Sequence, residues 1–68
     1  MLVLVETITG EIISEGDKIT NPDKTSGFYT GLMPPHARNE RGLIFVNNGK
    51  EWEDSYLPDT VGCKLVDI

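Results

Sequence analysis

The chain has 68 residues, 38% of them hydrophobic and 25% charged, and a formal net charge of −5. A chain of this length forms at most one domain and buries only about 60% of the surface that it exposes when unfolded, so a deep enclosed cavity is not expected. The composition is that of an ordinary globular protein, unlike that of disordered or membrane proteins. The negative charge opposes binding to the phosphates of nucleic acid.

Cys63 is the only cysteine. A single cysteine can form neither an intramolecular disulfide nor a cysteine-based zinc site within one chain, so we expect the domain to depend on its core or on a second subunit. We expect no cofactor. No apolar run approaches the roughly 20 residues that cross a bilayer, and no charged-then-apolar leader precedes the first strand. We therefore expect a cytoplasmic protein that does not contact the membrane.

The first element is an aliphatic run, Leu2-Val3-Leu4-Val5, which is followed by Thr7 and Ile8 and is ended by Gly10. Short β-branched and aliphatic runs favour a strand. Both faces of this strand begin apolar, whereas a strand of a small open barrel usually buries only one face. Either the terminal strand or a loop of the same chain covers the other face, or this run forms a dimer interface.

The next extended piece, residues 12–20, is interrupted at Glu15-Gly16-Asp17. Glycine tolerates positive φ, and the aspartate side chain can hydrogen-bond to nearby backbone, so this stretch predicts a corner and not an acidic site. Six turn-forming residues follow at 21–26, where Pro22 excludes a central strand. These residues predict an exposed loop.

Residues 28–33 show the period-two alternation of a half-buried strand, which Pro34-Pro35 ends. Residues 36–42 contain no periodic apolar position and predict a loop. Residues 43–46, Leu-Ile-Phe-Val, give the strongest predicted strand. The Asn48-Gly49 pair that follows is typical of a type I′ hairpin turn, so we expect residues 52–56 to run antiparallel to 43–46.

The end of the chain predicts a short helical turn and a last strand. Leu57-Pro58-Asp59-Thr60 favours the turn, with Asp59 or Thr60 able to cap it. Gly62 then leads into a strand from Cys63 to Ile68. No long helical period and no internal repeat is present.

The order of these elements resembles that of SH3 domains. Glu15-Gly16-Asp17-Lys18-Ile19 resembles their diverging-turn stretch, and Tyr56-Leu57-Pro58 resembles the step into their helical turn. The resemblance implies that residues 1–68 form one all-β domain, a five-stranded SH3-like barrel with one short 3-10 turn before the last strand. It does not extend to the polyproline groove, because the first strand carries no aromatic cluster and no tyrosine follows Pro58 in the helical turn.

A second resemblance is to short proteins of tailed bacteriophages that share a G-D-x-I-T step, a G-x-I-x-V strand and a Y-x-P-x-x-x-G ending. The corresponding pieces here are Gly16-Asp17-Lys18-Ile19-Thr20, Gly42-Leu43-Ile44-Phe45-Val46 and Tyr56-Leu57-Pro58-Asp59-Thr60-Val61-Gly62. This resemblance implies a phage accessory protein in the host cytoplasm, and it implies no defined activity.

The segment after the Asn-Gly pair is the strongest candidate for binding a partner. Residues 51–59 contain four acids and no lysine or arginine. Strand alternation leaves open whether Trp52 lies in the core or anchors a partner. We expect a non-enzymatic protein-binding module whose partner is a basic protein, steered by complementary charge. The candidate partner-binding residues are Glu51, Trp52, Glu53, Asp54 and Tyr56.

Two other functions stay open. The chain is alternatively a structural or assembly subunit that forms a homodimer through the first strand, at Leu2, Val3, Leu4 and Val5. The third function is a nucleic-acid-binding small barrel, which rests on the fold and on three loop residues, His36, Arg38 and Arg41.

Nothing in the sequence marks an enzyme or a metal site. His36, the only histidine, has no serine or cysteine at a spacing typical of a nucleophile pair. The acidic segment lacks the glycine-containing spacing of a calcium loop. We therefore expect neither catalytic residues nor metal ligands, and we expect Cys63 to be a small buried hydrophobe.

Overall fold

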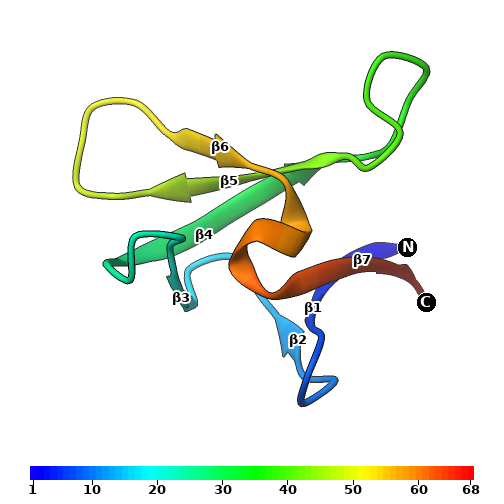
Figure 1. The fold of residues 1–68 in the computed structure, drawn as a ribbon, viewed down its shortest axis with the longest axis horizontal. Coiled ribbons are helices and arrows are strands. Elements are labelled where there is room, and N and C mark those ends of the chain that lie inside the picture. The colour runs from blue at the N-terminus through cyan, green and yellow to red at the C-terminus, as the bar shows by residue number, and fades with distance from the viewer.

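The computed structural model describes residues 1–68 and contains two antiparallel sheets (Figure 1). One sheet has the strand order β2-β1-β7 and the other β3-β4-β5-β6. The single helix, η1, is a 3-10 turn directly before the last strand, which confirms the all-β class and that turn. The elements are β1 (Leu2–Glu6), β2 (Ile12–Ile13), β3 (Lys18–Thr20), β4 (Ser26–Met33), β5 (Leu43–Asn47), β6 (Asp54–Tyr56), η1 (Pro58–Val61) and β7 (Cys63–Asp67).

The expectation of five strands is wrong, because the structure has seven strands in two sheets, and no strand pair joins the sheets into a closed barrel. One reason is the corner at Gly16-Asp17, which divides the extended piece 12–20 between the two sheets. Gly16 has φ 96°, and the Ser14 amide donates to Asp17 Oδ2 over 2.9 Å. The corner prediction is therefore confirmed, and the corner separates β2 from β3.

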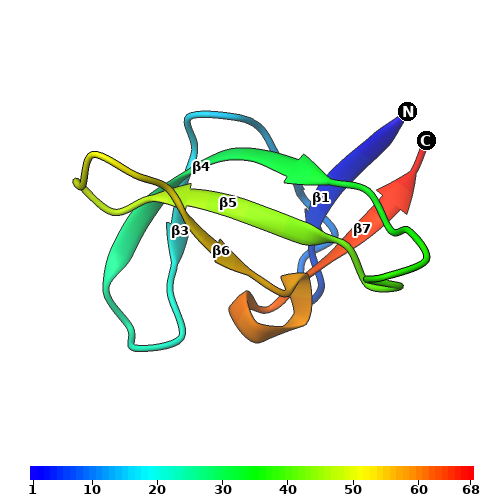
Figure 2. The same cartoon turned by 90° about the horizontal axis from the view of Figure 1, so that it is seen from above.

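β1 is the central strand of the smaller sheet. It pairs with β7 along its whole length, from Leu2 to Glu6, but with β2 only at Leu4 and Val5. The strand stops at Glu6, where the amide of Gly10 donates to the Glu6 carbonyl over 2.8 Å and closes the turn. The first and last residues consequently lie side by side (Figures 1 and 2).

β4 is the longest strand and lies between β3 and β5 (Figure 2). The predicted alternation is confirmed at its start, where Tyr29 is 3% exposed and Phe28 is 51% exposed. The register between β4 and β5 shifts between Tyr29 and Gly31, which marks a β-bulge. Bulges bend a strand and increase its twist, and this favours the curvature that brings two small sheets together.

The core lies between the sheets and is small. Both sheets contribute to it, and β1 supplies Leu4, one of its three fully buried large side chains. Cys63 is 4% exposed and belongs to the same cluster, as the sequence predicted. The cluster consists of Leu4, Ile19, Tyr29, Ile44, Val46 and Cys63.

β5 and β6 pair antiparallel, as predicted, but the predicted type I′ turn between them is wrong. Val46 pairs with Asp54, so the connection is longer than a two-residue turn. A type I′ turn needs positive φ at both central residues, but only Gly49, with φ 84°, has it here. The Asn48 side chain is instead held by Asn21, from another turn, and by Asp54, at the start of β6.

The predicted side-chain cap of the helical turn is also wrong. The N-cap of η1 is Leu57, which makes no side-chain cap hydrogen bond. Pro58 occupies the first turn, where its missing N–H leaves no donor unsatisfied. Thr60 Oγ1 instead donates to the Leu57 carbonyl over 2.7 Å.

Candidate functional site

The connection from Asn48 to Glu53 extends away from both sheets (Figure 1, yellow). It carries Trp52, the most exposed of the Phe, Tyr and Trp rings. Trp52 is 61% exposed, and its neighbours Glu51 and Glu53 are exposed as well. Lys50 Nζ lies 5.5 Å from the centroid of the Trp52 ring, at cation–π distance. Trp52 therefore lies on the surface and not in the core, a choice that the sequence left open.

The base of this connection is held by Asn48. Its Oδ1 accepts a hydrogen bond from Asn21 Nδ2 over 2.6 Å, and its Nδ2 donates to Asp54 Oδ2 over 2.8 Å. Asn21 is 4% exposed. The pKa of Asp54 is lowered, chiefly because Asn48 donates to the carboxylate and to a smaller extent because Lys50 lies nearby. Asn48 therefore ties the two ends of the connection to each other and to the 21–25 turn.

Gly27 on β4 provides the space that Asn48 occupies. A Cβ atom at this position would lie 2.5 Å from Val46 Cγ1 and would overlap Asn48 Oδ1. Because both distances are shorter than real side chains adopt, any larger residue would displace Asn48 or Val46. The sequence gives no sign of this requirement, since Gly27 lies near Asn48 only in the folded chain.

The five predicted partner-binding residues do not share one exposed strand. Glu51, Trp52 and Glu53 precede β6, and we call these three residues the loop surface. Asp54 and Tyr56 belong to β6 and are half-buried. Tyr56 packs against the core cluster, and Asp54 accepts the hydrogen bond from Asn48. These two residues support the loop and are not freely accessible.

The fold also neutralises half of the acidic segment. Asp54 lies 3.4 Å from Lys50 Nζ, and Asp59 forms an ion pair with Arg41 from the 34–42 loop. Glu51 and Glu53 form no ion pair, so the negative charge of the loop surface comes from these two side chains. Glu53 Oε2 accepts one hydrogen bond, from Thr30 Oγ1 on β4, over 2.5 Å.

The four residues predicted for self-association differ in their accessibility. Leu4 is 0% exposed and Val5 is 7% exposed, whereas Leu2 and Val3 are half-buried. Leu2 and Val3 have no strand partner on the β2 side. They line an open groove of about 410 Å³ whose other wall comes from β4.

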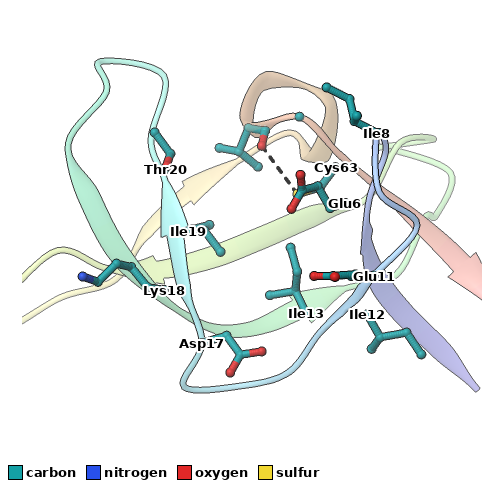
Figure 3. A pocket seen from close by; sticks show the side chains of 12 residues that line it. Glu6, Ile8, Glu11, Ile12, Ile13, Asp17, Lys18, Ile19, Thr20 and Cys63 are labelled. Carbon is teal, nitrogen blue, oxygen red and sulfur yellow. Dashed lines mark hydrogen bonds between the residues drawn. The ribbon is translucent and has the colours of Figure 1, made fainter.

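A larger groove of about 520 Å³, which the sequence did not reveal, lies between the β1–β2 hairpin, β3 and η1 (Figure 3). Ile13 and Ile19 form part of its apolar lining, and the carboxylates of Glu6 and Glu11 point into it. Cys63 lies in its wall, where burial and, to a smaller extent, Glu6 raise the pKa of the thiol.

His36 is exposed, and its Nδ1 accepts a hydrogen bond from the amide of Arg38 in the same turn, over 3.2 Å. No group of three or more His, Cys, Asp or Glu side chains could hold a metal ion. No helix has the length and apolarity that crossing a membrane requires. No family model, curated protein or solved structure matches this chain.

Proposed function

We propose that this chain is a non-enzymatic protein-binding module that uses the loop surface to bind a basic protein. The observation that carries the proposal is the 61% exposure of Trp52 on a connection that extends from the body of the domain. An indole in water contributes little to the core, whereas tryptophan is among the commonest anchors of protein interfaces. Trp52 is accordingly the residue that we expect a partner to bury.

The charges around Trp52 favour a basic partner. Glu51 and Glu53 flank the ring and carry no ion-pair partner, within a chain of net charge −5. Complementary charge raises the rate of association and discriminates against acidic partners. Lys50, which lies over the Trp52 ring, is paired with Asp54 and so does not cancel the charge of Glu51 and Glu53.

The fixed base of the connection supports the same function. Asn48 ties it to Asn21 and Asp54, so its ends are ordered before a partner arrives. Ordering a flexible segment on binding costs conformational entropy, and a surface that is already ordered avoids part of this cost.

The fold and the source are also part of the proposal. The order β2-β1-β7 beside β3-β4-β5-β6, with a bent connection between β2 and β3 and a 3-10 turn before β7, supports an SH3-like architecture. The resemblance of three short pieces to proteins of tailed bacteriophages supports an accessory protein whose target is a basic protein of the host.

Affinity purification from a lysate of the native host, followed by calorimetry with the purified partner, tests the proposal. Trp52→Ala should weaken binding at least about tenfold, because anchor residues contribute about 2 kcal/mol or more. Glu51→Lys should weaken binding and slow association. Glu40→Lys is the matched control, since it makes the same charge change on the exposed 34–42 loop. A partner that binds Trp52→Ala and Glu51→Lys as tightly as the unmodified chain would contradict the proposal.

Self-association is a second candidate, favoured by the groove of about 410 Å³ beside the unpaired edge of Leu2 and Val3. Light scattering at micromolar concentration should then detect a dimer that Val3→Lys disrupts and salt does not. Leu4→Lys is unsuitable, because Leu4 is 0% exposed and the charge would disrupt the core. A monomer at every concentration would remove this candidate.

A further inference from the structure

The groove of about 520 Å³ has two glutamates beside its apolar lining. In the smaller sheet, Leu4 pairs with Ile13 on β2 and with Leu65 on β7. Leu4 is fully buried, and Ile13 and Leu65 pack against the core. Paired residues on neighbouring strands point to the same face of a sheet, so this row faces inward.

The next inward-facing row is two residues further along each strand. Glu6 pairs with Cys63 on β7, and the amide of Glu6 donates to the carbonyl of Glu11 over 2.9 Å across the hairpin. Glu11, Glu6 and Cys63 therefore form the last inward row of the sheet. Figure 3 shows both carboxylates pointing into the groove.

Glu6 is half-buried and Glu11 is exposed, so both carboxylates face the groove while they stay in contact with solvent. Neither Glu6 nor Glu11 forms an ion pair, and neither carboxylate accepts a hydrogen bond. Lys18 lines the opposite wall but forms no ion pair with either. The groove thus combines an apolar lining with two carboxylates that lack a cation.

We propose that this groove binds a basic side chain, best an arginine, presented by an extended segment of a partner protein. The aliphatic stem would lie along Ile13 and Ile19, and the guanidinium would donate to Glu6 and Glu11. Arginine fits because it has an apolar stem and five N–H donors arranged as a planar fork that can serve two carboxylates. A bare divalent ion fits less well, because no third ligand joins the two carboxylates.

Two exposed isoleucines extend the groove and fit the neighbouring residues of such a segment. Ile8 is 93% exposed and Ile12 is 53% exposed, and both line the groove. The inference rests on the proposed function only in that the ligand belongs to a protein. The residues of the groove are separate from those of the loop surface, so binding in the groove and binding at the loop surface can be tested independently.

The test is an NMR titration of the ¹⁵N-labelled chain with the peptide acetyl-Val-Arg-Val-amide. Its analogue with citrulline, which has nearly the same shape and no charge, is the ligand control. We expect saturable shifts of the amides of Glu6, Glu11 and Gly62 with arginine, and affinity at least about tenfold lower with citrulline, because a charged hydrogen-bonded pair contributes about 1.5–3 kcal/mol.

Matched variants locate the binding. The double variant Glu6→Gln with Glu11→Gln should lower the affinity for the arginine peptide at least about tenfold. The double variant Glu51→Gln with Glu53→Gln removes the same charge from the loop surface and should leave that affinity unchanged. If the groove variant fails to fold, Glu11→Gln alone replaces it, since Glu11 is exposed. Equal affinity for arginine and citrulline, no saturable shift, or loss of binding only in the loop variant would overturn the inference. Groove binding without any partner for the loop surface would remove only the proposed function.

Discussion

Replacing Gly27 by alanine tests the physical basis of the projecting loop. The added Cβ would lie 2.5 Å from Val46 Cγ1 and would overlap Asn48 Oδ1. Val46 is fully buried and β-branched, so it has little freedom to move. Asn48 can move, but only by giving up its hydrogen bonds to Asn21 and Asp54. Gly27 does not have positive φ, so alanine adds no backbone strain.

The cost can be estimated from these two effects. Overpacking a core position costs roughly 1–3 kcal/mol, and the two hydrogen bonds of Asn48 contribute roughly 1 kcal/mol each. We expect the free energy of unfolding to fall by about 3 kcal/mol, from the roughly 3–10 kcal/mol typical of a domain of this size. For a small domain this corresponds to a fall in Tm of about 10–25 °C.

Urea unfolding followed by circular dichroism measures this change. Gly31→Ala is the matched control, because it makes the same substitution on the same strand and its Cβ would meet only Glu15 Oε1, at an ordinary contact distance of 3.7 Å. We expect the control to change the free energy of unfolding by less than about 1 kcal/mol. If Gly27→Ala is no more destabilising than Gly31→Ala, the packing of Asn48 against Gly27 is not what fixes the loop.

Three further outcomes follow from the same structure. Trp52→Ala should change the free energy of unfolding by no more than about 0.5 kcal/mol, because the ring is largely exposed; a cooperative loss of stability would place the ring in the core. In a carboxyl NMR titration, Asn48→Ala should raise the pKa of Asp54 toward its ordinary value of 3.8. The pKa of Asp23 should stay unchanged, because its lowering comes from hydrogen bonds with Thr25. The pKa of Asp54 is lower in the folded than in the unfolded chain, so the contribution of Asp54 to stability is present above pH 3.8 and is lost as the pH falls through the folded-state pKa. A curve of stability against pH that Asn48→Ala leaves unaltered would contradict this. The thiol of Cys63 should react with iodoacetamide much more slowly in the folded chain than in urea, because burial raises its pKa, and equal rates would show that it is accessible.

Local chemistry was enough to predict the class of the fold. The alternation in residues 28–33, the aliphatic runs at 2–5 and 43–46, and the proline that begins the 3-10 turn are short-range patterns, and each corresponds to an element of the structure. The Gly16-Asp17 corner could also be predicted, because glycine and aspartate favour turns and the hydrogen bonds between Ser14 and Asp17 join near neighbours in the sequence. Its backbone hydrogen bonds to Tyr29 on β4 form only in the folded chain.

The tertiary structure decided the contents of both candidate sites. Asn48 reads as a turn residue, yet Asn21, far away in the sequence, holds its side chain, and Arg41 neutralises Asp59 from another loop. Likewise, Glu6 and Glu11 become an inward pair only when the hairpin register and the β7 pairing are both known. The sequence by itself determined where the chain extends and turns, because those preferences depend on adjacent residues. Which charges remain unpaired, and which ring remains exposed, depends on contacts between distant segments, and only the folded chain brings these together.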